Sequence, residues 1–284
     1  MRKQFWPKSP GDATSMVFVL LIMPSVYMFE LTIVLPELYP TTSLVYYLHF
    51  IFGTFLMMNI VGNYIYSVLC DTSTRTTIIQ QSLSESRIQE GWQFCSACES
   101  IAPPRSWHCS TCEICILKRD HHCMFTGCCV GHFNHRYFTM FLLYLFIATT
   151  YSFIYNSYFL WGRIHFQFPL SIIKFIFPFA IFAFGFDDSM EQLYLMFYIV
   201  CVIGMIFTGV LSVYHVHLIL SGSVAHEKSK NITKYNNGWR DNIIQVFGDK
   251  WYLTWITPFI KSTLPHDGTN WPPSATWKED SKNR

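Results

Sequence analysis

The sequence predicts a mostly α-helical, polytopic membrane protein with four transmembrane helices and a cytosolic, loop-rich, cysteine-rich domain between the second and third helices. Three observations lead to this prediction. Of the 284 residues, 51% are apolar and only 13% are charged, a composition that soluble domains of this size seldom have. Four apolar runs are each about long enough to cross a hydrocarbon core of roughly 30 Å. Eight cysteines and three histidines lie between Cys95 and Cys129.

The predicted elements follow the apolar runs in order. Residues 1–15 are polar and are expected to form a cytosolic tail. Transmembrane helices are expected at residues 16–36, 44–69, 137–161 and 192–220. Residues 166–186 are also apolar but contain Pro169, Lys174 and Pro178. We therefore expect residues 162–191 to form a lumenal segment that is partly embedded in the membrane and does not cross it.

Basic residues set the expected orientation, because they favour the cytosolic ends of spans. Residues 1–15, 70–136 and 221–284 together hold 18 of the 20 Lys and Arg. Four spans place all three segments, and both termini, in the cytosol. A fifth crossing would place the most basic segment, residues 221–284, on the opposite side of the membrane. The first apolar run lacks a small-residue cleavage site and should stay as an anchor. The glycosylation sequon at Asn231 lies in the tail that is expected to be cytosolic, so we expect it to be unused.

A net charge of +2 is too small to indicate nucleic acid as a partner, and the basic residues fit contact with membrane lipid instead. The tail 221–284 mixes basic and aromatic residues, which suits packing on the membrane interface or on the central loop. The sequence carries no signal of the protein's oligomeric state. Cys70, where the second span meets the cytosol, could itself be acylated or be an unmodified thiol.

The central loop, residues 70–136, divides into a polar part, 71–93, expected to be partly helical, and the cysteine-rich domain at about 93–138. Two-residue gaps such as Cys95-x2-Cys98 let a tight turn present both sulfurs to one ion. Disulfides are the alternative, but a cytosolic loop is in a reducing compartment. We therefore expect zinc, and we expect it to supply the folding energy of a domain with few aliphatic residues.

The number of donors exceeds what two ions need. Eight donors complete two tetrahedral zinc sites, whereas this segment has eleven Cys and His side chains. A thiol left over beside a histidine is a candidate nucleophile, because the imidazole can take its proton.

These motifs resemble the DHHC family of protein S-acyltransferases. The matching pattern is Cys-x2-Cys, then Pro103-x-Arg105, His-Cys-x2-Cys-x2-Cys-x4-Asp-His-His-Cys, and a Cys-Val-Gly-x2-Asn-x3-Phe run that ends at Phe138. Its place between the second and third of four spans also matches. Gly238, Asn242 and Phe247-Gly248 resemble the family's carboxyl-terminal motif, so the resemblance covers roughly residues 44–248.

The resemblance implies that Cys123 is the acylated nucleophile, that His121 is its general base and that Asp120 orients His121. It implies palmitoyl-coenzyme A or another acyl-CoA as co-substrate, and substrate proteins with membrane-proximal cysteines as partners. It also implies two structural zinc ions held by interleaved ligand sets, with His122 rather than His121 on zinc. The two sets are Cys95, Cys98, His108 and Cys115, and Cys109, Cys112, His122 and Cys129.

Two stretches depart from the family pattern. Residues 124–128 are Met-Phe-Thr-Gly-Cys where the family more often has Pro-Trp-Val-Asn-Asn, and residues 224–227 are Val-Ala-His-Glu in place of Thr-Thr-x-Glu. Cys128 could be a buried thiol, a second acyl acceptor or a substitute zinc ligand. His132 and His135 are expected at the surface or on the substrate side, without metal.

The leading prediction is a membrane palmitoyltransferase that acylates its own Cys123 and then a substrate cysteine. The alternative is a noncatalytic membrane zinc scaffold that recruits cytosolic partners, and a zinc-dependent ubiquitin ligase is a third possibility with less suitable ligand spacing. A scaffold has no need of Asp120, His121 and Cys123 beside complete zinc sites. The family suggests the endoplasmic reticulum or Golgi as the location.

Overall fold

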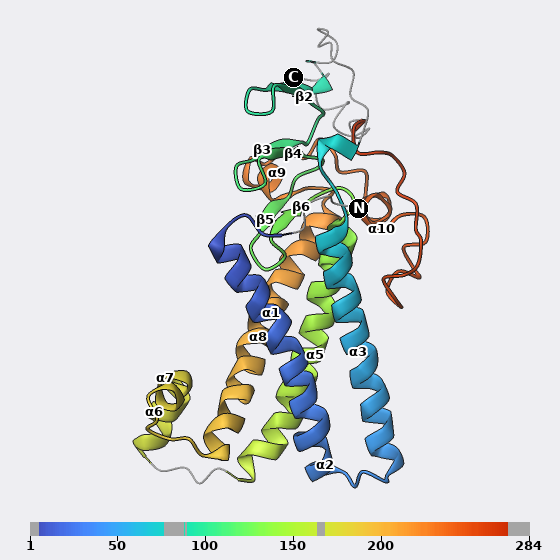
Figure 1. Ribbon diagram of the computed structural model, residues 1–284. Helices are drawn as coiled ribbons and strands as arrows, with labels where there is room; N and C mark the ends of the chain where they lie inside the picture. Colours follow the sequence, from blue (N-terminus) through green and yellow to red (C-terminus); the bar gives the residue numbers. More distant parts are fainter. Residues whose placement is uncertain (1–5, 77–87, 89, 164–167, 272–284) are drawn as a thin grey trace. The chain divides into compact units, whose positions relative to one another are not determined.

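Four long helices dominate the computed structural model, which describes residues 6–76, 88, 90–163 and 168–271 (Figure 1). The first is α1 (Pro10–Phe29), which continues through a π-helical turn (Glu30–Val34) into α2 (Leu35–Leu38). The others are α3 (Leu44–Leu69), α5 (His135–Trp161) and α8 (Met190–Leu220). All four are long and apolar enough to cross a membrane. The prediction of a mostly helical, multi-pass membrane protein with a cysteine-rich region between the second and third spans is confirmed.

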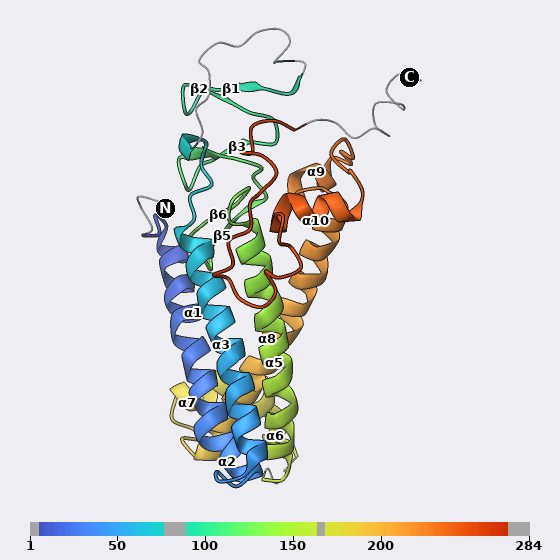
Figure 2. The ribbon, with the colours of Figure 1, turned by 90° about the vertical axis from the view of Figure 1, so that its right-hand side faces the viewer.

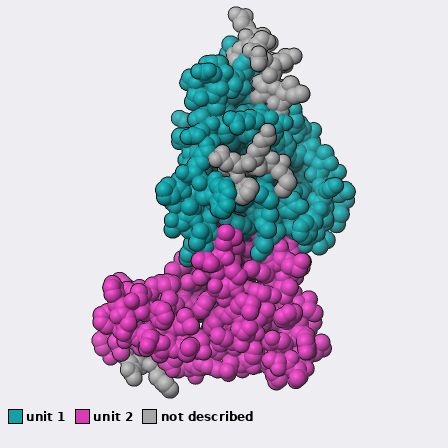
Figure 3. All heavy atoms as spheres, in the orientation of Figure 1, with its two compact units in different colours: residues 1–19, 61–141, 213–284 teal, residues 20–60, 142–212 magenta. Residues whose placement is uncertain are grey.

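The chain forms two compact units, shown in teal and magenta in Figure 3. The first unit comprises residues 1–19, 61–141 and 213–284, and the second comprises residues 20–60 and 142–212.

The second unit packs around aromatic side chains. Phe29, Val34 and Phe159 are buried together, and the ring of Phe197 stacks on Phe29 with 4.4 Å between centroids. Glu30 is buried in the same unit and accepts a hydrogen bond of 2.6 Å from the Asn156 amide. A carboxyl group in such a place requires a polar partner, because unpaired polar groups are costly away from water.

The segment expected to be lumenal contains two short helices, α6 (Leu170–Ile176) and α7 (Pro178–Ala183). Lys174 pairs with Asp187 just beyond them. The expectation that residues 166–186 dip into the membrane stays a prediction, and residues 166 and 167 lie outside the described residues. Most of residues 71–93, the polar part of the central loop, also lies outside the described residues. Its described portion includes a 3₁₀ turn (Thr74–Thr76).

The cysteine-rich region in the first unit consists of three antiparallel hairpins. They are β1 (Gln93–Cys95) with β2 (Ser100–Ala102), β3 (Trp107–Cys109) with β4 (Ile114–Ile116), and β5 (His121–Cys123) with β6 (Cys128–Val130). In both views the hairpin β5–β6 lies nearest the ends of α3 and α5, and β1–β2 lies farthest away (Figure 2). Glu99 and Glu113, each directly after a Cys-x2-Cys pair, have φ angles of 48° and 54°. At each position the left-handed backbone conformation turns the chain back, so that the two strands of the hairpin can pair.

The carboxyl-terminal tail packs on the hairpins through a buried ion pair. It contains α9 (Ala225–Ser229) and α10 (Trp239–Phe247). The Arg105 guanidinium donates to both carboxylate oxygens of Glu227, at 2.7 and 2.6 Å, and the two side chains are 0% and 2% exposed. Arg105 also lies over the rings of Tyr235 and Trp271, at 4.4 and 4.6 Å from their centroids. Arg105 therefore anchors the tail to the central loop.

Removing one partner of this pair should destabilise the first unit. We expect Glu227→Ala to lower the free energy of unfolding by about 3–5 kcal/mol, because it leaves the Arg105 charge buried without a partner. Chemical denaturation of the detergent-solubilised chain measures this change. The matched control is Glu37→Ala, which breaks an ion pair with Arg163 whose side chains are 55% and 36% exposed, and should cost about 0–1 kcal/mol. Equal losses in the two variants would contradict the anchoring role.

Candidate functional site

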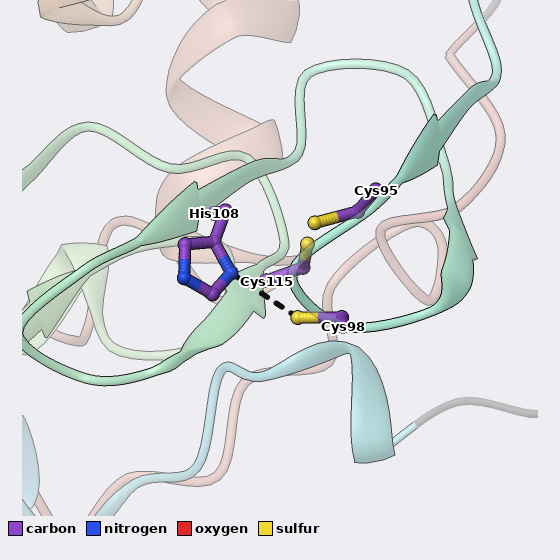
Figure 4. A group of neighbouring side chains, drawn as sticks. All are labelled: Cys95, Cys98, His108 and Cys115. Carbon is purple, nitrogen blue, oxygen red and sulfur yellow. Dashed lines mark hydrogen bonds between the residues drawn. The ribbon is translucent and has the colours of Figure 1, made fainter.

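The first donor cluster joins the hairpins β1–β2 and β3–β4. Cys95 and Cys98 come from the first hairpin, and His108 and Cys115, directly opposite each other, come from the second. Their donor atoms all lie within 4.8 Å of one another, and Cys98 Sγ is 3.2 Å from His108 Nδ1. Figure 4 shows the three sulfurs together on one side of the His108 ring. Four donors from two hairpins thus converge on one point.

The second donor cluster joins the hairpins β3–β4 and β5–β6. Cys109 and Cys112 form its first pair, and His122 and Cys129 are register partners across β5 and β6. His122 Nδ1 lies 3.6, 3.4 and 3.7 Å from the sulfurs of Cys109, Cys112 and Cys129. The Cys112 and Cys129 sulfurs are 3.8 Å apart.

These spacings fit zinc. Bonds of about 2.0–2.1 Å to nitrogen and about 2.3 Å to sulfur, arranged tetrahedrally, separate N and S donors by about 3.6 Å and two S donors by about 3.8 Å. The second cluster matches both separations, and each cluster has the Cys₃His composition of structural zinc sites. The structure therefore brings together the same two interleaved sets that the resemblance implies, and each set could bind one zinc ion.

Strand geometry separates the roles of the neighbouring residues His121, His122 and Cys123. Side chains alternate between the two faces of a strand, so His121 and Cys123 share one face of β5 while His122 points to the other. His122 meets the second donor cluster, whereas His121 and Cys123 lie outside both. His121 and Cys123 are hydrogen-bonded to each other. The thiol is thus left free of the metal clusters and paired with an imidazole.

Asp120 holds His121 from the other side. One carboxylate oxygen, Oδ2, accepts a hydrogen bond of 2.7 Å from His121 Nδ1, and the other, Oδ1, accepts one of 2.8 Å from the backbone N–H of Ala225. The His121 Nδ1 proton therefore points to Asp120, which leaves Nε2 to exchange a proton with Cys123.

The charges of these three groups support one another. Burial acts to lower the pKa of His121, but hydrogen bonds with Asp120 and Cys123 outweigh it and raise the pKa to about 9. Burial acts to raise the pKa of Cys123, yet the hydrogen bond with His121 and the charge of that ring hold the pKa below its ordinary value. Burial likewise opposes ionisation of Asp120, and the surrounding histidines keep its pKa low. The arrangement favours a thiolate beside an imidazolium.

A further histidine, His215 of α8, lies beside this group. Its Nδ1 is 3.8 Å from Asp120 Oδ2, its ring centroid is 5.4 Å from that of His121, and it is buried. One donor atom from each of Asp120, His121 and His215 also lies within 4.8 Å of the other two. The short hydrogen bond between Asp120 and His121 already pairs these two groups. His215 lies far along the chain from Asp120 and His121, so local sequence patterns carry no signal of this contact.

Cys128 is a buried thiol opposite Cys123 in the β5–β6 register. Its sulfur donates weakly to the Ser67 carbonyl at 3.5 Å and to Thr126 Oγ1 at 3.6 Å. It belongs to neither donor cluster. Of the alternatives considered for this residue, the buried thiol agrees best with the structure.

His132 and His135 were expected at the surface or on the substrate side. The surface alternative is wrong, because each is only 1% exposed, and the substrate-side alternative stays a prediction. The carboxyl-terminal tail folds over His132, which donates from Nε2 to the His266 carbonyl at 2.9 Å and stacks on the His266 ring. A contact between residues so far apart in the chain leaves no trace in local sequence.

Comparison with known proteins agrees with the family that the sequence motifs resemble. The DHHC palmitoyltransferase family model matches residues 88–232. The chain is 32% identical over 230 residues to the probable palmitoyltransferase ZDHHC24 of Danio rerio, covering 80% of this chain and 76% of that protein. It is 32% identical over 225 residues to the human protein of the same name, covering 78% of each chain. It is 27% identical over 218 residues to the palmitoyltransferase ZDHHC22 of Danio rerio, covering 72% and 73%.

The two clusters predict how zinc content responds to single substitutions. The purified chain should hold two zinc ions, and Cys129→Ala or His122→Ala should reduce the number to about one, because each removes a donor from the second cluster only. His121→Ala and Cys128→Ala, the matched neighbours, should keep both ions. Elemental analysis per mole of protein measures this. Zinc loss from His121→Ala or Cys128→Ala, with retention in the other two variants, would reverse the assignment.

Proposed function

Because this chain belongs to the DHHC palmitoyltransferase family and is a protein S-acyltransferase, we propose that Cys123 is the thiol that carries the acyl group. One observation supports this choice above all others. Cys123 hydrogen-bonds a histidine that a carboxylate holds, and it is a member of neither donor cluster. The proposed donor is an acyl-coenzyme A, with palmitoyl as the acyl group that the family's name indicates.

In the first proposed step, His121 takes the proton of the Cys123 thiol. The thiolate attacks the carbonyl carbon of the acyl-coenzyme A thioester, and a new carbon–sulfur bond forms. The bond to the coenzyme sulfur then breaks, and the proton on His121 passes to the departing thiolate. The products are acylated Cys123 and free coenzyme A.

In the second proposed step, a cysteine thiol of a substrate protein gives its proton to His121 and attacks the acyl carbonyl carbon. The bond to Cys123 breaks, and the Cys123 thiolate recovers the proton. One thioester is exchanged for another in each step, so the reaction needs positioning and thiol activation more than a driving force.

The zinc ions have a structural part in this proposal. The eight donors would hold two ions that fix the hairpins. The chain's own residues do the rest. Asp120 fixes the His121 tautomer, the backbone N–H of Ala225 fixes Asp120, and the position of Cys123 beside His121 sets the path of the proton.

We further propose that the cysteine-rich domain and both termini face the cytosol, since the three segments 1–15, 70–136 and 221–284 carry 18 of the 20 basic residues. Acyl-coenzyme A could then keep its phosphates in water while its acyl chain enters the membrane. Substrates would be proteins with cysteines near the membrane surface. The proposed location is an endomembrane, the endoplasmic reticulum or Golgi.

Removing the thiol should abolish acyl transfer. The purified chain incubated with a clickable palmitoyl-coenzyme A should acquire hydroxylamine-labile label, and Cys123→Ala should lose it, because the nucleophile is absent. Cys128→Ala, the matched control across the hairpin, should retain it. His121→Ala should slow labelling by about 10²–10⁴-fold. Undiminished label on Cys123→Ala would exclude Cys123 as the acyl carrier.

The hydrogen bond from the Ala225 backbone to Asp120 can be removed without changing a side-chain donor. Ala225→Pro deletes the N–H at the first position of α9, where proline is tolerated, and Val224 before it is already extended. We expect the labelling rate to fall about tenfold, because a hydrogen bond to a charged group is lost.

Zinc content should stay at two ions in the Ala225→Pro variant. Ala225→Ser, which keeps the N–H, serves as the control and should label at the rate of the unmodified chain. An unchanged rate in Ala225→Pro would show that Asp120 needs no support from the tail.

A further inference from the structure

The first turn of α1 lies against the second donor cluster. Asp12 Oδ2 is 3.1 Å from His122 Nε2, and the two side chains are only 7% and 16% exposed. Asp12 comes from the amino-terminal end of the chain, more than a hundred residues before its partner. Neither the zinc ligands nor the proposed acyl-transfer steps account for a carboxylate buried here.

The orientation of the His122 ring determines the chemistry of this contact. Nδ1 faces the three sulfurs of the cluster, so it must present its lone pair to a metal ion. Nε2 then carries the proton of the neutral ring, and the Nε2–H group donates a hydrogen bond to the Asp12 carboxylate. A carboxylate in this position fixes the tautomer and the ring orientation and makes Nδ1 a stronger ligand.

Further contacts hold residues 7–16, which we call the amino-terminal arm, around the same cluster. Lys8 donates to the carbonyl of the ligand Cys112 at 3.3 Å and forms an ion pair with Glu113. At Gly127, a Cβ atom would lie 2.6 Å from Met16 Sδ and 3.2 Å from Pro7 Cβ. The arm therefore meets the cluster at its histidine, at one cysteine and at the turn of β5–β6.

Gly127 connects this packing to the sequence. It lies in residues 124–128, the stretch that departs from the family pattern, at a position where that pattern has asparagine. Its φ of 58° favours glycine, and the Met16 side chain occupies the space that a Cβ atom would take. The departure therefore makes room for the arm beside the hairpin that carries Cys123.

From these contacts we propose that Asp12 is an outer-sphere residue of the second zinc site, through which the start of the first span stabilises the ion held by Cys109, Cys112, His122 and Cys129. The inference concerns metal affinity and needs no acyl-transfer step. It distinguishes the two sites, because Asp12 contacts the histidine of the second cluster. Since His122 directly precedes Cys123, the arm also positions the strand that carries the thiol.

The test measures zinc release from the full chain in detergent, with Cys123→Ala as background so that acylation plays no part. A chromogenic chelator in excess reports the two ions as they leave. Removing such a partner usually lowers metal affinity about 10–100-fold, so with Asp12→Asn we expect one ion of the two to leave faster by about that factor while the other keeps its rate. Asp12→Glu, which restores a carboxylate, should recover part of the difference.

The matched control is Asp241→Asn, which changes an exposed aspartate that is also in the first turn of a helix. It should release both ions at the unmodified rates. Unchanged release in Asp12→Asn would overturn the proposal, and so would equal acceleration of both ions, because that result would indicate general loss of folding. Failure of the acyl-carrier proposal would leave all these rates as they are.

Discussion

The convergence of four donors on each of two points is the constraint on which the first unit depends. The hairpins are three residues per strand, and such short pairs cannot stabilise themselves in water by backbone hydrogen bonds and apolar burial alone. Each cluster draws its donors from two hairpins, so a metal ion at either point would fix one hairpin against the next. The middle hairpin, β3–β4, supplies donors to both. The position of the β5–β6 hairpin, and hence of the thiol on it, follows from this chain of links.

The alternation of side chains along β5 then divides the metal from the chemistry. His122 faces the second cluster, and its two neighbours on the opposite face, His121 and Cys123, meet each other. Asp120 and the tail complete the group, because one carboxylate oxygen accepts from His121 and the other from Ala225. Glu227 lies in the same short helix as Ala225, and its buried pair with Arg105 keeps that part of the tail in place. A structural ion site and a reactive thiol can therefore occupy adjacent residues without competing for the same side chains.

Sequence patterns predicted the spans and the donors because both are local. Lipid requires long apolar runs, and zinc requires closely spaced cysteines, so each leaves a signature in consecutive residues. The contacts that position the donors are not local. Arg105 with Glu227, His132 with His266 and Asp12 with His122 join distant segments, and no spacing rule connects them. The Ala225 contact uses a backbone N–H, which any residue except proline provides, so its side chain carries no signal. The surface placement of His132 and His135 failed for the same reason.

The central claim is that the acylated thiol and the zinc ligands are different cysteines. Mass spectrometry of the intact chain under native conditions, after incubation with palmitoyl-coenzyme A, tests it most directly. The account predicts a species that carries one palmitoyl group and two zinc ions at once, with the acyl group on the peptide that contains Cys123 after digestion. An acylated population that has lost zinc in proportion to acylation would contradict the account, because the acylated thiol would then be a ligand.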